Sequence, residues 1–230
     1  MMRDQVVLIT GAGGGIGLHM AGYLLDRGFR VCGADLDIRS MGTLTGRRPG
    51  RFIAAECDVT DPGDTEEVME MVIGTWDRMD VLVNNAATAG PAMEEMEVNY
   101  LGALRMTRAA VPYMAERGGI VHMVSSLLAL TGMPGMSGYA ASKAALEGLS
   151  RSLSLELRDK GIAVTLMYPP PTGTGMGPDL PKRLLVDPEK VGRRLGRRIL
   201  SPGPVICAGP AVRLGLYASR LMPAAIGRLF

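Results

Sequence analysis

The sequence is poor in the residues that bind metals and form disulfides, with three cysteines and two histidines in 230 residues. Cys32, Cys57 and Cys207 are scattered and odd in number, which is typical of buried thiols in a reducing compartment rather than of a disulfide framework. His19 and His122 have no partner at ligand spacing, so both are expected to be structural. We therefore expect no metal site.

The chain also lacks an excess of charge and a long apolar run. Its formal net charge is +2, so no strong attraction to nucleic acid is expected. No segment reaches the roughly 18 apolar residues of a membrane span, and the apolar run at 6–10 is too short for the core of a signal peptide. We expect a cytoplasmic protein. An arginine stripe at 193–198 is expected to be a solvated helix face, with contact to an anionic substrate or a membrane surface as the alternative.

No linker, internal repeat or low-complexity tract divides the chain. A length of 230 residues with 47% hydrophobic residues suits one folded domain with a sizeable core. We therefore expect a single domain over residues 1–230.

Apolar runs alternate with segments of helical periodicity. The predicted strands are 5–10, 29–35, 51–59, 81–84, 119–125, 162–167 and 205–207. The predicted helices are 16–27, 65–77, 94–117 with a kink at Pro112, 137–159, 187–200, and a tail interrupted by Pro223. Asp61 or Asp64 is expected to cap the helix at 65. Repeated strand–helix–strand units predict an α/β, doubly wound, Rossmann-type parallel sheet with helices on both faces.

A glycine-rich segment, TGAGGGIG at 10–17, joins the first strand to the first helix. Gly11, Gly15 and Gly17 carry no Cβ, so the backbone there can approach a pyrophosphate at the helix N-terminus. An ordinary tight turn is the alternative reading of this segment.

Asp35 ends the second predicted strand. A carboxylate at this place can accept hydrogen bonds from the adenosine ribose and would repel a 2′-phosphate, so NAD is favoured over NADP. A solvated aspartate is the alternative, and the neighbouring Asp37 and Arg39 leave the assignment open.

Tyr139 and Lys143 lie four residues apart in YAASK and therefore on one helix face, with Ser126 preceding them in the sequence. An ammonium near a phenol favours the phenolate, and a nearby serine hydroxyl can hold a carbonyl or alcohol oxygen. Beside a dinucleotide, such a site moves a proton, which indicates hydride transfer.

These motifs resemble the short-chain dehydrogenase/reductase family, in its compact single-domain branch, over about residues 6–176. The family's cofactor turn TGxxxGIG matches 10–17, including Gly14 and Ile16. Its adenine-contacting Asp-Val pair matches Asp58 and Val59, and its NNAG motif matches 84–87, including Asn85 and Ala86.

The resemblance also implies the catalytic roles. Tyr139 would be the general acid in reduction and the general base in oxidation, and Lys143 would lower the pKa of Tyr139 and hydrogen-bond the nicotinamide ribose. Ser126, favoured over Ser125 by its spacing to the tyrosine, would orient and polarise the substrate oxygen. Asn99 would hold a water that links Lys143 to solvent.

The sequence departs from the family pattern in three places. Ala87 replaces the last glycine of NNAG, and the segment 84–99 is short, which predicts a trimmed loop and a more open cleft. The family's Pro-Gly after the sixth strand is Pro169–Pro170 here, and the second proline lacks an N–H group. Thr172 and Thr174 fall where the family contacts the nicotinamide carboxamide.

Five methionines fall in segments expected to border the cleft: Met93, Met96, Met133, Met136 and Met176. Flexible thioethers suit a loosely defined apolar pocket, although ordinary core packing is an equal alternative. If they line the pocket, the substrate is a lipophilic alcohol or ketone. A loop at about 170–186 is expected to contribute to the substrate side.

The tail at about 209–230 is apolar, and it is expected to cover the cleft, dock on a second subunit or touch a membrane. The family resemblance implies a homodimer or homotetramer formed through the two long helices. The predicted function is an NAD-dependent oxidoreductase acting on a small-molecule secondary alcohol or ketone. The alternatives are a non-redox isomerisation, dehydration or decarboxylation on the same scaffold, and a non-catalytic dinucleotide sensor.

Overall fold

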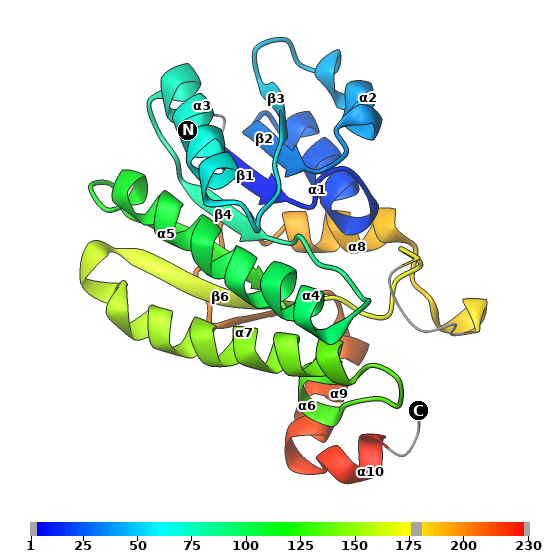
Figure 1. Cartoon of the computed structure of the whole chain (residues 1–230). Helices are drawn as coiled ribbons and strands as arrows, with labels where there is room; N and C mark the ends of the chain where they lie inside the picture. Colours follow the sequence, from blue (N-terminus) through cyan, green and yellow to red (C-terminus); the bar gives the residue numbers. More distant parts are fainter. Residues whose placement is uncertain (1–3, 176–180, 228–230) are drawn as a thin grey trace.

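The computed structural model describes residues 4–175 and 181–227 (Figure 1). Its centre is a seven-stranded parallel sheet in the order β3-β2-β1-β4-β5-β6-β7. The strands are β1 (Val6–Thr10), β2 (Arg30–Asp35), β3 (Phe52–Glu56), β4 (Val81–Asn84), β5 (Gly119–Val124), β6 (Ile162–Tyr168) and β7 (Val205–Cys207). The order reverses between β1 and β4, and parallel sheets of this kind bind ligands beyond the carboxyl ends of the strands at that point. The predicted fold class is confirmed.

Helices cover both faces of the sheet because successive strand side chains point to opposite sides. In β1, Val6 and Leu8 join one half of the core, whereas Val7 and Ile9 join the other. The first half packs under α3 (Pro62–Trp76), α5 (Ala103–Met114) and α7 (Ser137–Glu156). The second half packs under α1 (Gly15–Asp26) and α8 (Pro188–Gly196), which lie side by side on the far face (Figure 1).

Helix α3 begins at Pro62, three residues earlier than predicted, because proline suits the first helical position. Of the two predicted caps, Asp61 is the one used: its carboxylate accepts the N–H of Gly63 over 2.6 Å. Asp64 instead accepts the backbone N–H of Asp58, and so ties the helix to the segment that follows β3.

The helix predicted at 94–117 has three parts: α4 (Ala92–Met96), a π-helix η2 (Glu97–Gly102), and α5, with Pro112 inside its last turns. The uninterrupted helix of the prediction was therefore wrong. A Cβ on Gly102 would lie 2.7 Å from Cγ2 of Val59, so this turn packs directly against the segment after β3. Single π-turns inside α-helices occur frequently at functional sites, and this one carries Asn99.

Several short elements were not predicted: η1 (Arg39–Met41), α2 (Gly42–Thr45), α6 (Leu128–Thr131) and η4 (Lys182–Leu184). The helix predicted at 137–159 is α7 followed by the separate turn η3 (Arg158–Lys160). The tail forms α9 (Pro210–Leu221) and α10 (Pro223–Gly227), which Pro223 separates as expected. Figure 1 shows α9 and α10 gathered around α6. Within the described residues, no helix is long and apolar enough to cross a membrane.

Candidate functional site

A cleft of about 850 Å³ opens beyond the carboxyl ends of the strands. Its wall brings together the glycine-rich turn, Asp35, and the Ser126–Tyr139–Lys143 group. The remaining wall is formed by the start of α6, the segment 169–175 and the tail helices. Residues far apart in the sequence thus share one cavity at the place where the strand order reverses.

The glycine turn is held against the end of β4 by side chains. The amide nitrogen of Asn85 donates to the carbonyl oxygens of Thr10 and Gly11 over 2.9 and 3.0 Å. The hydroxyl of Thr10 accepts the backbone N–H groups of Asn85 and Ala86. Gly11 has a φ of 66°, and a Cβ there would lie 2.7 Å from Cα of Ala86. Asn85 and Ala86 therefore shape the turn, and Thr10 is a supporting residue that the sequence analysis did not single out.

The other glycines leave room for a ligand or for close packing. A Cβ on Gly14 would meet nothing within 4 Å, so its backbone faces open space, and Ile16 beside it lines the cleft. A Cβ on Gly17 would collide with the carbonyl of Gly11, which explains how the helix starts so close to the strand. Exposed N–H groups at a helix start fit a pyrophosphate, and the turn therefore fits a dinucleotide.

Asp35 lies at the cleft, and its two oxygens are oriented by the backbone. Oδ2 accepts the N–H of Gly13 over 2.7 Å, and Oδ1 accepts the N–H of Asp37 over 3.1 Å. The carboxylate of Asp37 pairs with Arg39 over 2.6 Å, and this exposed pair lowers the pKa of Asp37 to about 2. Of the two neighbouring carboxylates, Asp35 is the one that lines the cleft.

Asp58 and Val59 are not among the residues that line the cleft. The carboxylate of Asp58 accepts the N–H and the hydroxyl of Thr60 over 2.8 and 2.7 Å. Val59 is 7% exposed and packs against Gly102. Both residues contact other groups of the protein, and an adenine contact by them stays a prediction.

Tyr139 and Lys143 stand on one face of α7, as the spacing predicted, and both line the cleft together with Ser126. Lys143 is 2% exposed, and its ammonium donates to the carbonyl oxygen of Val124 over 2.9 Å. Burial lowers the pKa of Lys143 to about 8. The ammonium lies 5.7 Å from the centre of the Tyr139 ring.

The pKa of Tyr139 is raised above the usual phenol value, in contrast to the expectation that Lys143 lowers it. Burial is the largest cause, a hydrogen bond with Ser126 acts in the opposite direction, and the charge of Glu95 raises the pKa further. Burial of the phenol is the physical reason for the difference, and the ammonium of Lys143 donates to the Val124 carbonyl.

Asn99 is buried in the π-helix and fully engaged by protein groups. Its amide nitrogen donates to the Thr88 carbonyl and to the Ser142 hydroxyl, each over 3.0 Å, and its oxygen accepts the Thr88 N–H over 2.8 Å. The side chain thus joins the trimmed loop to the turn of α7 that carries Lys143. Its role in a water relay stays a prediction.

Hydrogen bonds hold the backbone of the trimmed loop between β4 and α4 in place. Besides Thr88, Gly90 donates its N–H to Oε1 of Glu95 over 3.1 Å. Ala87 lines the cleft, so the extra methyl group of the NNAA motif lies in its wall.

The segment after β6 also lines the cleft, through Pro169, Pro170, Pro171, Thr172 and Thr174. It is folded back on itself, since Thr172 pairs with Val186 and the N–H of Val186 donates to the carbonyl of Pro171 over 2.8 Å. A Cβ on Gly15 would lie 2.8 Å from the methyl carbon of Thr174. The segment therefore touches the glycine turn, and carboxamide contacts by the two threonines stay a prediction.

The methionine prediction holds for part of the set. Met133 and Met136 line the cleft, whereas Met93 is 78% exposed and, like Met96, is not among the lining residues. Met93 was wrongly placed, since it lies in α4 with its side chain in solvent; Met176 lies outside the described residues.

Other residues that the sequence analysis did not name individually line the cleft. They come from α6, the segment before α8, and the tail: Leu127, Leu128, Leu185, Gly215 and Ile226. The tail therefore covers the cleft, which was one of its three predicted roles. The packing of α9 and α10 against α6 brings Gly215 and Ile226 to the site.

The remaining predicted candidates lie apart from the cleft. His122 is buried, its Nε2 lies 2.8 Å from the Ile199 carbonyl, and burial lowers its pKa to about 4. Arg193 pairs with Glu189 on the exposed face of α8, as a solvated stripe would. In the part of the chain that the structure describes, no cluster of His, Cys, Asp and Glu could hold a metal ion.

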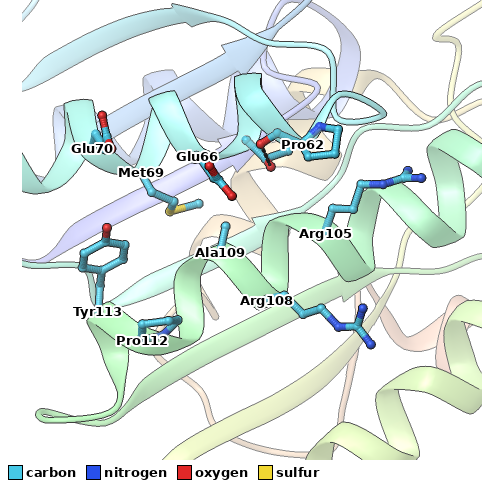
Figure 2. Close-up of a pocket in the computed structure, with 10 residues that line it drawn as sticks. Pro62, Glu66, Met69, Glu70, Arg105, Arg108, Ala109, Pro112 and Tyr113 are labelled. Carbon is cyan, nitrogen blue, oxygen red and sulfur yellow. Dashed lines mark hydrogen bonds between the residues drawn. The ribbon is translucent and has the colours of Figure 1, made fainter.

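A second groove, of about 480 Å³, runs between α3 and α5 (Figure 2). Glu66 and Glu70 project from one helix, and Arg105, Arg108 and Tyr113 from the other. Arg105 pairs with Glu97 over 3.0 Å. The groove holds none of the residues of the glycine turn or of the Tyr139–Lys143 group, so it is not the candidate active site.

The glycine-rich turn and the Ser126–Tyr139–Lys143 group share one cavity beyond the carboxyl ends of a parallel sheet, an arrangement typical of oxidoreductases that use a nicotinamide dinucleotide. The family model of the short chain dehydrogenases matches residues 5–184, and the chain belongs to this family. As a member, the protein is an oxidoreductase acting on hydroxyl or keto groups.

Three similar proteins illustrate the relationship. The 3-oxoacyl-[acyl-carrier-protein] reductase FabG of Thermotoga maritima is 33% identical over 79% of this chain and 80% of its own length. A 3-ketodihydrosphingosine reductase of Bacteroides thetaiotaomicron is 35% identical over 76% of this chain and 66% of its own. The solved structure of a short-chain dehydrogenase from Streptomyces avermitilis has a TM-score of 0.80 at 29% identity, covering 94% of this chain and 91% of that one.

Proposed function

We propose that the protein is an NAD-dependent oxidoreductase that interconverts a lipophilic secondary alcohol and its ketone. The observation that carries this proposal is the joint position of Ser126, Tyr139 and Lys143 in the wall of the cleft that holds the glycine turn and Asp35. The bound nicotinamide supplies or accepts the hydride.

The chain's own residues would handle the proton and the substrate oxygen. Tyr139 donates its phenol proton to the oxygen in reduction and takes the hydroxyl proton in oxidation. Ser126 hydrogen-bonds that oxygen and the phenolate, which the hydrogen bond with Tyr139 supports. Lys143, with a pKa of about 8, places a positive charge beneath the pair at neutral pH.

Four observations support the finer points of the proposal. The orientation of Asp35 by Gly13 supports a ribose contact and therefore NAD. The apolar wall from α6 and the tail supports a lipophilic substrate. A relative named as a 3-ketodihydrosphingosine reductase supports a keto group as the reacting centre. The buried free thiols of Cys32 and Cys57 support the cytoplasm as its location.

The test is a panel of apolar ketones and alcohols, followed by NADH absorbance, with Tyr139→Phe as the variant. We expect turnover to fall by about 10³-fold while the NADH dissociation constant stays unchanged, since the phenol moves a proton and the glycine turn binds the cofactor. Tyr113→Phe, in the groove away from the cleft, is the matched control and should keep full turnover.

Three outcomes would contradict the proposal. Unchanged turnover in Tyr139→Phe would reject the role of the phenol. A product formed without net change in NADH would indicate a non-redox reaction. Tight NADH binding without turnover of any carbonyl compound would indicate a dinucleotide sensor.

A further inference from the structure

Glu147 is a buried carboxylate that the proposed reaction does not use. It follows Tyr139 and Lys143 along α7 at two successive steps of four residues, and therefore lies on the same face of the helix. Its side chain is 4% exposed. A charge in such a place is unfavourable unless hydrogen-bond donors surround it.

Two hydroxyl groups satisfy this carboxylate, and both come from the ends of neighbouring strands. The Ser125 hydroxyl donates to Oε1 over 2.9 Å, and the Tyr168 hydroxyl donates to the same oxygen over 2.6 Å. Ser125 directly follows β5, and Tyr168 ends β6. One oxygen atom therefore joins two strand ends to helix α7.

Burial and hydrogen bonding favour the contact between the Tyr168 hydroxyl and the Glu147 carboxylate. Burial, followed by the hydrogen bond to Glu147, raises the pKa of Tyr168 above its usual value, so the phenol stays a donor; Arg220 acts in the opposite direction. Arg151 lies 3.9 Å from Oε2, but its side chain is 69% exposed, so solvent weakens this ion pair. The two hydroxyl donors are the main partners of the carboxylate.

The segments that carry both donors form part of the cleft wall. Ser125 and the following Ser126 both line the cleft, and Tyr168 precedes Pro169, which lines it as well. A shift of either strand end would move a wall residue relative to Tyr139 and Lys143.

We propose that Glu147 is a positioning residue, which holds the strand ends that carry Ser126 and Pro169 in register with the helix face that carries Tyr139 and Lys143. It acts through Ser125 and Tyr168 and touches neither substrate nor cofactor. The inference rests on the proposed function for its effect on turnover, whereas its effect on binding is measured without a substrate.

The experiment compares Glu147→Ala with Glu147→Gln by calorimetric titration with NADH and with ADP. Glu147→Ala removes the shared acceptor and leaves two buried hydroxyls unpaired, so we expect NADH to bind about tenfold more weakly. ADP lacks the nicotinamide half, and its affinity should not change. Glu147→Gln keeps Oε1 as an acceptor and should restore NADH binding. Exposed Glu156→Ala, at the end of the same helix, is the matched control.

If Glu147→Ala does not fold, two variants that each remove one hydroxyl donor, Ser125→Ala and Tyr168→Phe, test the proposal instead. Each should weaken NADH binding by less than Glu147→Ala, and neither should weaken it further when added to that variant. With a substrate in hand, kcat should fall in Glu147→Ala and recover in Glu147→Gln.

Equal weakening of ADP and NADH would show that Glu147 serves only general stability, and would overturn the proposal. Unchanged NADH binding in Glu147→Ala, or a loss in Glu147→Gln as large as in Glu147→Ala, would overturn it as well. Failure to turn over any ketone would count against the proposed function but would leave the binding result intact.

Discussion

At the scale of single residues, Asp35 is the residue that we propose to contact the adenosine ribose. Its carboxylate is held in place by Gly13 and Asp37. We expect Asp35→Ala to weaken NADH binding about tenfold and to reduce the preference over NADPH, because the charge that repels a 2′-phosphate is removed. Dissociation constants for both cofactors measure this.

Asp37→Ala is the control for Asp35, since the Asp37 carboxylate pairs with Arg39 outside the cleft. It should leave the ratio of the two dissociation constants unchanged. An unchanged ratio in Asp35→Ala as well would rule out the ribose contact.

Glu95 is a buried carboxylate whose charge raises the pKa of Tyr139. Glu95→Gln keeps an oxygen for the N–H of Gly90 but removes the charge. Because a negative charge disfavours the phenolate, the variant should have a lower Tyr139 pKa. The rise of alcohol oxidation with pH should therefore shift to lower pH, as measured by kcat/KM against pH.

The neighbouring Glu94 is exposed, and Glu94→Gln serves as the control. A pH profile that does not move in Glu95→Gln would show that this carboxylate acts only on the loop at Gly90.

Sequence motifs predicted which residues meet at the cleft, but not how they are held. Ser126, Tyr139 and Lys143 follow from fixed spacing. Glu95 and Glu147 look like ordinary helical glutamates in the sequence. Their burial depends on the packing of α4, β5 and β6 against α7, which no local pattern encodes.

At the scale of elements, the outward face of α7 carries small residues at helical spacing: Ala141, Ala144, Gly148 and Ser152. Such a face would let a second helix approach closely, and we propose that it forms the homodimer or homotetramer that the family resemblance implies. We expect Gly148→Arg to dissociate the assembly to monomers in sedimentation velocity. A Cβ on Gly148 meets only the Arg151 side chain, at 3.9 Å, so the fold tolerates the change.

Gly74→Arg is the matched control, because a Cβ on this α3 glycine meets nothing within 4 Å. It should sediment like the unchanged protein. A monomer before any substitution would contradict the proposed assembly.

The elements themselves were predictable to different degrees. Buried parallel strands such as β1 and β4 are continuous apolar runs and were placed almost to the residue. The π-turn at 97–102 was not predictable, because six residues are too few to show a period of their own. Helices of four residues, such as α2 and α6, are too short to show a period.

At the scale of the whole molecule, the sequence predicted one domain and one sheet because every strand–helix unit repeats the same pattern. It did not predict which distant segments meet across the cleft. The contact of Thr174 with Gly15, and of the tail with α6, brings together residues that follow different strands. Such contacts depend on how the whole chain packs, and not on local sequence patterns.

The tail helices close a wall of the cleft without supplying Ser126, Tyr139 or Lys143, the residues that we propose to handle the proton and the substrate oxygen. We therefore expect substitutions at Gly215 or Ile226 to alter the shape of the cleft and to leave the proposed reaction in place. Substrate specificity could therefore change through substitutions in the tail helices, in evolution or by protein engineering, while the residues proposed for catalysis stay the same.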